Sequence, residues 1–541
     1  MKRLLLASAA VAALGCPVWA QSAIDMLQLT QPDTRGTARF MGMGGAFTAL
    51  GGDLSTLTQN PAGIGIYRHS EIGVTVDLDI QKSSVGGVGN SKTQFNCNNF
   101  GYIGVANLNS SVAQTFAWGA TYNRTSSFDR LTSAYAPTAA TSLSNYIASY
   151  TTADEGVLNF GGDYNPYRDS DADWLSILAY SAYMINPKDG STNRYNGLYQ
   201  PGLTNSDAML TVRERGYVDE YSINFGGNLS NTLYWGLGVG ITDLSYRRDA
   251  YYSESMENAR CVADGGATTI TNGDAGFELG NYKKINGSGW KLSFGLIYKP
   301  INALRIGAAI HSPTWWSLSQ EYDGTVSYSY FNPSQPQSSG NPLSGDDYTD
   351  FAGFDWKLKS PWRFMVGAAV VLGSNAIISV DYERQAYNDM TMKNAVYDNY
   401  GYIMGHEDNE AVNNDVRTYC RAANIVRVGA EYRVTPAFSI RAGYNVATSN
   451  IDARTRDGGV EVITSGTDPS YSFGKTNQSV SFGLGYRFGA FYLDGTYVYN
   501  RRTSDLHAYT NFTDNGVLAQ APSWEVTNTN NSIVLSLGFR F

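Results

Sequence analysis

The chain has 541 residues and a formal net charge of −9, and only 16% of its residues are charged, against roughly 25% in an average protein. It contains 38 Tyr and 57 Gly. This excess of tyrosine and glycine favours many short strands, tight turns and aromatic girdles. The acidic balance argues against nucleic-acid binding, so no nucleic-acid partner is expected. No run after the N-terminus approaches the roughly 20 apolar residues of a membrane helix.

Residues 1–20 have the order of a secretory signal peptide. Lys2 and Arg3 precede the apolar run Leu4–Leu14, and a small-residue cleavage site ends at Ala20. The alternatives are a buried N-terminal helix and a lipoprotein site at Cys16. We expect cleavage after Ala20 and therefore export from the cytoplasm.

Fourteen segments alternate between apolar and polar residues, with aromatic residues near many of their ends. They are 71–82, 98–109, 113–125, 211–228, 232–252, 275–299, 303–327, 353–372, 375–391, 420–433, 437–450, 472–488, 490–503 and 526–541. In the last segment, Ile533, Leu535, Leu537, Phe539 and Phe541 share one face. An open terminal strand of this kind invites aggregation, whereas a closed barrel in lipid gives it a partner and covers its apolar face. The pattern predicts an all-β membrane protein, a 14-stranded antiparallel transmembrane β-barrel over 71–541 whose last strand pairs with 71–82.

The connections support the same topology. The links after even-numbered segments are very short, as at 229–231 and 434–436, and those after odd-numbered segments are expected to be long and polar, the largest being 126–210. Short turns at one end and long loops at the other are typical of an outer-membrane barrel. An even strand number then predicts both termini on the short-turn, periplasmic side.

Residues 21–70 are rich in glycine and small residues and do not read as strands. They contain the cluster Gly42, Gly44 and Gly45, then the acidic Asp53, and then Asn60-Pro61-Ala62 just before the first strand. The cluster follows no predicted strand and lacks the Gly-Lys-Ser/Thr ending of a phosphate loop. Short helices and turns packed inside the barrel suit this composition.

These residues, with the barrel that follows, resemble the FadL-type long-chain fatty-acid and toluene transport family, in the form found in Bacteroidetes-type bacteria. The resemblance implies that residues 21–70 form a hatch, or plug, in which Asn60, Pro61, Ala62, Gly42, Gly44 and Gly45 belong to the hatch motif. It also implies lateral release of solute beside a kinked third strand, here 113–125. Gly119 is the candidate for that kink, and it also fits a packing glycine beside Trp118.

The long loop 126–210 contains one apolar stretch, 171–185. Asp171 or Asp173 could cap a helix there, and Trp174, Leu175 and Leu178 would lie on its apolar stripe. The helix either packs against other loops or forms an external groove that captures an apolar solute.

Chemistry for catalysis or metal binding is weak. The four histidines are widely spaced, and Cys97, Cys261 and Cys420 show no metal-ligand spacing, although export would permit one disulfide among them. We expect no enzyme activity, no metal site and no cofactor. A haem-ligating group on the loop 400–406, around His406, is kept as an alternative.

The leading hypothesis is passive uptake of hydrophobic solutes such as long-chain fatty acids across the outer membrane. The solute would be captured by external loops, bound in the lumen and released past the hatch or laterally. The expected partners are a hydrophobic small molecule such as a fatty acid or hydrocarbon, outer-membrane lipid and the barrel insertion machinery. The rival hypotheses are a secretion-system shuttle or structural barrel and a haemin-binding receptor.

Overall fold

The computed structural model describes residues 22–541 except 159–164, 171, 189–190, 264–267, 335–340, 374, 399, 465 and 515. The predicted signal peptide and Asp171 lie outside this part.

Fourteen antiparallel strand positions form one closed barrel, as the alternation predicted. In spatial order they are β1 (Glu71–Val85), β2 (Val88–Asn107), β3 (Ala113–Ser127) continued by β4 (Arg130–Ala136), β7 (Asn205–Leu229), β8 (Leu233–Ala263), β9 (Thr268–Ile301), β10 (Leu304–His311) continued by β11 (Trp315–Phe331), β13 (Ala352–Lys359) continued by β14 (Arg363–Leu372), β15 (Ala376–Gln385) continued by β16 (Thr391–Tyr397), β18 (Ala423–Arg433), β19 (Phe438–Ala447), β20 (Tyr471–Phe488), β21 (Phe491–His507) and β24 (Ser523–Arg540).

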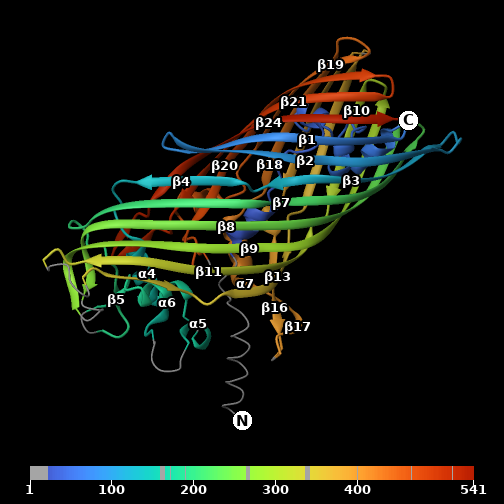
Figure 1. Ribbon diagram of the computed structural model, residues 1–541. Coiled ribbons are helices and arrows are strands. Elements are labelled where there is room, and N and C mark those ends of the chain that lie inside the picture. Colours follow the sequence, from blue (N-terminus) through green and yellow to red (C-terminus); the bar gives the residue numbers. More distant parts are fainter. Residues whose placement is uncertain are drawn as a thin grey trace.

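The last strand closes the barrel against the first, which confirms the predicted pairing. β24 runs antiparallel to β1 from Arg540 opposite Glu71 to Val526 opposite Val85. The backbones of Phe541 and Ser70 exchange two further hydrogen bonds of 3.0 Å. Figure 1 shows the C-terminus beside the start of β1. The terminal strand therefore has no free edge.

The outer surface of the barrel carries an apolar band. In β24, Ile533, Leu535 and Leu537 are about half exposed, whereas Val534 and Ser536 between them are buried. Two exposed tryptophans, Trp290 of β9 and Trp315 of β11, lie with ring centroids 4.5 Å apart and ring planes tilted by 37°. Exposed apolar residues bounded by aromatic rings are the surface of a membrane-spanning barrel.

Two of the connections between strands are shorter than predicted. The short turns stand where expected, but two of the links expected to be long are also short. β1 and β2 are joined by Gly86-Gly87 alone, and β8 and β9 run far past the apolar band to a link at 264–267. Both glycines have positive φ, which this tight turn requires. The alternation of apolar and polar residues weakens where these strands extend beyond the apolar band, so their outer halves were predicted as loops.

Three neighbouring strand positions bend at one level. β10 and β11 are separated at 312–314, β13 and β14 at 360–362, and β15 and β16 at 386–390, where a short 3-10 helix, η5 (Tyr387–Asp389), forms. Pro313 and Pro361 lie in the first two breaks, because proline has no N–H for a strand ladder.

The remaining elements fill or cover the barrel (Figure 1). Inside lie α2 (Ala23–Thr30), α3 (Ala38–Gly42) and the 3-10 helices η1 (Leu54–Thr58) and η2 (Pro61–Ile66). At the long-loop end lie α4 (Leu143–Tyr150), the π-helix η3 (Thr151–Glu155), α5 (Pro166–Asp169), α6 (Trp174–Ser181), α7 (Glu410–Tyr419), α8 (Ala453–Arg456), β5 (Asn186–Pro187), β6 (Tyr195–Asn196), β12 (Leu343–Tyr348), β17 (Ile403–Asp408), β22 (Phe512–Asp514) and β23 (Val517–Ala519). Within the described residues, no helix is long and apolar enough to cross a membrane.

The two ends of the described chain lie at different levels. Phe541 is at the short-turn end. Ser22 lies inside the barrel, in a cavity that Lys283 also lines, and Lys283 is on β9 beyond Trp290 toward the long loops. The chain thus enters the lumen above the hatch, and a periplasmic N-terminus stays a prediction.

Candidate functional site

The predicted hatch motif lies at the centre of the barrel. Asn60 caps η2: its side-chain oxygen accepts from the Ala62 N–H at 3.0 Å, and its amide donates to the Thr48 carbonyl at 2.6 Å. Pro61 occupies the first turn, where its missing N–H costs nothing. All three motif residues are buried, Asn60 and Ala62 fully. The motif therefore folds the hatch back on itself.

Glycines on the inner wall of the barrel make room for the hatch. A Cβ added at Gly236 would overlap the Pro61 carbonyl, and one at Gly307 would overlap that of Thr48. A Cβ at Gly443 would overlap the backbone N–H of Gly44. Gly44 and Gly45 themselves have positive φ, so the turn after α3 requires them. Backbone thus packs on backbone, which explains much of the glycine excess.

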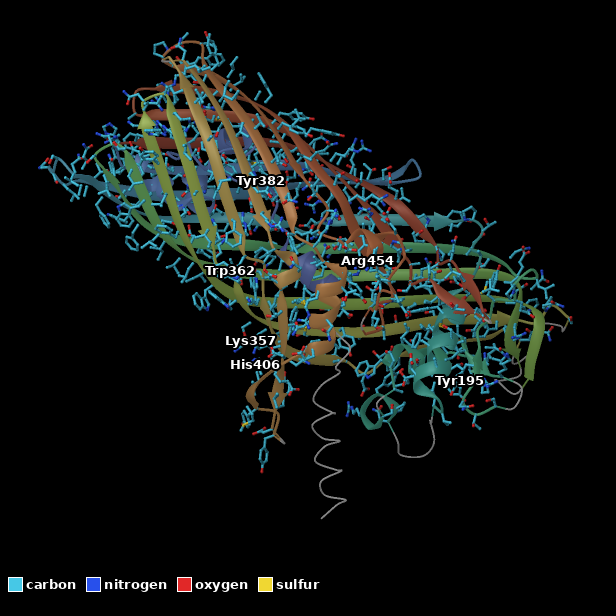
Figure 2. All side chains as sticks on the ribbon, turned by 180° about the vertical axis from the view of Figure 1, so that it is seen from behind. Tyr195, Lys357, Trp362, Tyr382, His406 and Arg454 are labelled. Atoms are coloured by element: carbon cyan, nitrogen blue, oxygen red, sulfur yellow. The ribbon has the colours of Figure 1, made fainter. Side chains whose placement is uncertain are left out.

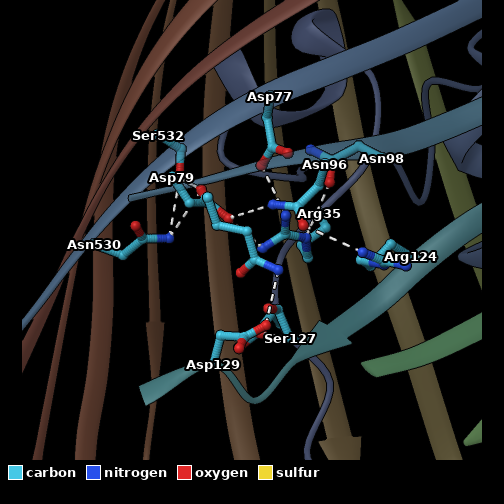
Figure 3. A network of polar contacts seen from close by, with 12 residues as sticks. Arg35, Asp77, Asp79, Asn96, Asn98, Arg124, Ser127, Asp129, Asn530 and Ser532 are labelled. Carbon is cyan, nitrogen blue, oxygen red and sulfur yellow. Dashed lines mark hydrogen bonds and ion pairs between the residues drawn. The ribbon is translucent and has the colours of Figure 1, made fainter. Parts of the chain in front are cut away.

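Buried ion pairs hold the hatch to the wall. Arg35 donates to Asp77 at 2.7 Å and to Asp79 at 2.9 Å, both on the inward face of β1. It also donates to Asn98 of β2 at 3.0 Å, and Figure 3 shows the guanidinium group enclosed by these partners. Breaking one side of a buried pair costs about 3–5 kcal/mol, because a charge is left without a partner.

A second set of contacts fixes the other side of the hatch. Arg39 donates to Glu431 of β18 at 2.8 Å. The Thr48 N–H donates to Asp381 of β15 at 2.7 Å, and the His311 ring donates to the Gln59 carbonyl at 2.7 Å. Strands on several sides of the barrel therefore hold the predicted hatch inside the lumen.

The wall of the barrel is discontinuous between β2 and the third strand position. β2 pairs with β3 only from Asn107 to Asn99, and no ladder pairing joins its described residues 88–98 to β3 or β4. Instead, Lys92 on the inward face of β2 forms an ion pair with Asp129, which lies between β3 and β4. β4 therefore lies on the luminal side of the β1–β2 hairpin.

The side chains of β4 reach across to β1. The hydroxyl groups of Thr132 and Ser83 are 2.8 Å apart, and Ser83 is on the inward face of β1. Within the part of the chain that the structure describes, side-chain contacts thus hold the two parts of the wall together above Asn99. Such contacts open more readily than a backbone ladder.

A cavity of about 90 Å³ lies at this discontinuity. The hatch contributes Arg35 and Met41 to its lining, and β21 and β24 contribute mainly polar residues. Gln81, Lys82 and Ser83 also line it, and consecutive strand residues point to opposite faces. The cavity therefore lies between the predicted hatch and the edge of the β1–β2 hairpin, at the gap in the wall.

Two further cavities lie above the hatch, on either side of α2. One, of about 100 Å³, touches Ser22, Asp25 and Gln28, and the other, of about 80 Å³, touches Leu29 and Thr30. The first shares wall residues with the cavity at the discontinuity. These two cavities are therefore neighbours, separated by Arg130, Arg502 and Asn528, which line both.

The predicted third-strand residue Gly119 lies in regular register. It pairs with Ile103 of β2 and Asn224 of β7. The ladder between β3 and β7 is irregular on either side of it, between Ala113 and Thr115 and between Arg124 and Ser126. A Cβ at Gly119 would press on the Tyr102 carbonyl and Ile103, so close packing accounts for this glycine.

The predicted loop helix forms as α6, capped by Asp173, which accepts from the Leu175 N–H at 3.2 Å. Leu175 and Leu178 are buried in a large apolar core that the long loops build with the outer halves of the strands. Trp174 is half-buried and contacts Tyr322, with ring centroids 5.3 Å apart and ring planes tilted by 43°. A capture role for these side chains stays a prediction, and their burial favours packing.

The loop group 400–406 lies on the hairpin β16–β17, outside the barrel. Figure 2 shows His406 there beside Lys357. Tyr400 and Met404 are exposed by 87% and 72%. Cys97, Cys261 and Cys420 are all free.

The luminal ion pairs escaped the sequence analysis. Asp77 and Asp79 stand two residues apart in a predicted strand and therefore share one face. That spacing signals inward carboxylates, but it does not identify Arg35 as their partner, since Arg35 lies in a segment without periodicity.

Comparisons with known proteins give only distant matches. A scan against protein-family models gives no match, and no curated protein matches. Among solved structures, the P. putida toluene transporter TodX is 14% identical with a TM-score of 0.44, covering 94% of this chain and 99% of its own. The Ralstonia pickettii toluene transporter TbuX is 14% identical with a TM-score of 0.42 at the same coverage. A Pseudomonas aeruginosa FadL homologue is 12% identical with a TM-score of 0.49, covering 95% of this chain and 100% of its own.

Proposed function

We propose that this barrel is an outer-membrane channel of the FadL type for passive uptake of hydrophobic solutes such as long-chain fatty acids. The long loops would face outward and the short turns the periplasm. Outer-membrane lipid would surround the apolar band, and the insertion machinery would read the terminal strand ending at Phe541. The solute would cross without chemical conversion.

One arrangement supports the proposal: residues 38–66, the predicted hatch, pack against the inner wall near the short turns, and the wall is interrupted beside a cavity. A polar-solute pore needs an open water path along the barrel axis, and the hatch stands in that path. The discontinuity between β2 and β4 lies opposite residues of β1 that flank the exposed Leu78, in the apolar band. A solute that leaves there enters lipid, which suits only a hydrophobic compound.

The driving force would be burial of apolar area, at about 25 cal/mol per Å². The solute would move from water into the lumen and from the lumen into the bilayer, so no energy input is required. The cavity at the discontinuity is lined by Lys82, Lys92, Arg130 and Arg502, among other polar residues. This lining suits a solute with a polar or anionic head group on an apolar chain.

Uptake of radiolabelled oleate by a deletion strain tests the proposal. The intact protein should restore uptake, whereas a form lacking residues 38–66 should restore a leak that also admits small polar antibiotics. If the intact protein restores no uptake and secretion of surface proteins is lost in the deletion strain, the transport proposal is wrong and the secretion-shuttle hypothesis gains.

A further inference from the structure

The short-turn end of the barrel is basic, although the chain as a whole carries a formal net charge of −9. The turns and the strand ends beside them cover residues 66–71, 107–113, 229–233, 298–306, 371–377, 432–439, 486–492 and 538–541. These ranges contain one acidic side chain, Glu71, against the cationic side chains of Arg68, Lys299, Arg305, Arg433, Arg487 and Arg540. Figure 1 shows the turns at the end of the barrel that carries the C-terminus. Charge is therefore distributed unevenly along the barrel axis.

Most of these cations have no carboxylate partner. Arg540 is the exception, because it forms an ion pair with Glu71 on the neighbouring strand β1. Arg305 donates to the Leu50 carbonyl at 2.9 Å, and its buried Nε meets no acceptor among the described residues. Within the part of the chain that the structure describes, no ion pair forms at five of the six, which we call the basic mouth: Arg68, Lys299, Arg305, Arg433 and Arg487.

The strand residues of the basic mouth face the barrel axis and not the bilayer. Alternate residues of a strand share a face. Arg433 is on the face of β18 that carries the buried Glu431, and Arg305 is on the face of β10 that carries the buried His311. Arg487 likewise lies on the inward face of β20. Lipid headgroups surround the outside of the barrel, so they are not the partners of these side chains.

Like charges lie close together in the basic mouth. Arg305 and Arg68 are near enough to Lys299 for their charges to repel its ammonium group. Arg433 repels the guanidinium group of Arg487 in the same way. These charges are not neutralised within the described chain, unlike those of the ion pairs around the hatch. The basic mouth therefore attracts anionic groups from the solution.

The spread of the cations argues against a small ion as their common partner. β10 and β20 are five strand spacings apart, with β14, β15, β18 and β19 between them. At about 4.8 Å for each spacing, Arg305 and Arg487 lie roughly 24 Å apart along the wall, far more than one phosphate or carboxylate group can bridge. A standard protein interface covers about 800 Å² on each partner, a patch roughly 30 Å across. The basic mouth has the dimensions of such a patch.

The residue types favour a protein over an anionic glycan. All but Lys299 are arginines, which bind carboxylates through two parallel hydrogen bonds and are enriched at protein interfaces, where lysine is depleted. Apolar side chains are exposed beside the cations: Ile301 by 60%, close to Lys299, and Val434 by 50%, next to Arg433. Apolar contacts next to carboxylate-binding arginines suit the surface of a folded protein.

We propose that the basic mouth is a docking surface for an acidic face of a water-soluble periplasmic protein. The inference rests on the orientation given in the proposed function, with the short turns in the periplasm, and it does not depend on the solute. Aspartate and glutamate side chains of the partner pair with Arg433 and Arg487 at the rim and with Lys299 and Arg305 deeper in the mouth. Exposed charges are screened beyond about 10 Å at 0.1 M salt, so docking weakens as salt rises.

Binding of a fluorescent decaglutamate peptide to the full-length protein in lipid nanodiscs tests the surface. Arg433→Glu with Arg487→Glu should weaken binding at least about tenfold at low salt. The matched control, Arg417→Glu with Arg454→Glu, makes the same change of charge on exposed residues of α7 and α8 at the long-loop end and should leave binding unchanged. Equal losses in the two double variants would overturn the proposal. Stronger competition by inorganic phosphate or by a muramyl peptide than by unlabelled decaglutamate, at equal charge concentration, would also overturn it.

Photocrosslinking in cells gives a second readout. A p-benzoylphenylalanine in place of Val434 should give a discrete adduct with a water-soluble protein of net negative charge. The adduct should be lost in the Arg433→Glu and Arg487→Glu double variant and kept in the matched control, with oleate uptake equal in all three proteins. Absence of the adduct, or an adduct that survives the charge reversal, would overturn the docking surface and leave the proposed function standing. Absence of oleate uptake in all three, with the adduct present, would overturn the proposed function alone.

Discussion

Removing Arg35 should loosen the hatch while leaving the barrel closed. Arg35→Met takes away the only guanidinium group that contacts Asp77 and Asp79 among the described residues, at 2.7 and 2.9 Å. Both carboxylates are fully buried, so they cannot regain water without movement of the hatch. Loss of one side of a buried ion pair costs about 3–5 kcal/mol. Because β1 stays in register with β2 and β24, this cost falls on the hatch.

The assay is hydrogen exchange of residues 34–66, compared with barrel peptides of the same protein. A cost of about 3 kcal/mol raises the open population roughly 100-fold, at about 1.4 kcal/mol for each factor of ten. Adding Asp77→Asn and Asp79→Asn to Arg35→Met should recover most of the protection, because neutral amides are less costly to bury. Protection that changes less than about fivefold in Arg35→Met, or a triple variant no better than the single one, would refute this reasoning.

Three further predictions concern the packing of the hatch, the long-loop core and its ionisation. Gly307→Ala should cost about 1–3 kcal/mol of hatch stability in denaturant titrations, because the added methyl overlaps the Thr48 carbonyl. The control Gly474→Ala should cost little, because its methyl meets nothing within 4 Å. Equal unfolding midpoints for the two variants would contradict the close packing. Glu254 lies on β8 well beyond the apolar band. It accepts hydrogen bonds from the Leu143 N–H at 2.8 Å and the Tyr252 hydroxyl at 2.6 Å. Burial raises the pKa of this carboxyl to about 7. The folded loop core therefore favours the protonated acid, so its stability is highest below about pH 4.5 and falls by up to about 3 kcal/mol as the pH rises to about 7. Protease cleavage of the loop 143–185 should speed up over that pH range in the wild type and not in Glu254→Gln. Identical pH profiles for the two proteins would contradict this role of Glu254. Leu178→Asp buries a charge in the core built by the long loops and should unfold that core. If α6 also captures solute, oleate uptake at low oleate concentration should fall. Unchanged uptake would support a purely structural role for α6.

The barrel was predictable because lipid imposes a strict alternation on every membrane-spanning segment. In a strand that faces lipid, Ile533, Leu535 and Leu537 must share one face. An even number of such antiparallel strands can close into a barrel. The outer halves of β8 and β9 were missed because no lipid faces them, so nothing in their sequence has to alternate. Pro313 and Pro361 could have indicated the strand breaks, because proline interrupts the hydrogen bonding between strands. The apolar-polar alternation continues on either side of each proline, so each break was predicted as part of one strand.

The hatch motif was predictable only as a segment. Asn60, Pro61 and Ala62 were placed in the lumen through the family resemblance, and their hydrogen bonds follow from ordinary helix capping. The partners of Arg35 and of Arg39 could not be predicted. Each pair joins residues whose separation in sequence is set by the closed barrel and not by any local period.

The same limit applies to the gap in the wall. Gly119 was the conspicuous glycine of the third strand, yet the strand leaves the ladder near Thr125 and Asp129. The departure depends on side-chain contacts of Lys92 and Ser83 with β4, which no single-strand pattern reveals.

The most direct test of lateral passage is oleate uptake through a gap that can be blocked and reopened. In a Cys97→Ser background, Ser91→Cys places a thiol on the exposed face of β2 at the cavity lining, and Ser317→Cys places a matched thiol on the exposed face of β11. A bulky disulfide-forming reagent should reduce uptake through the Ser91→Cys protein at least about tenfold, with recovery after reduction, and should leave the Ser317→Cys protein unaffected. Uptake that persists after full modification of the thiol at position 91 would contradict passage through the gap between β2 and β4.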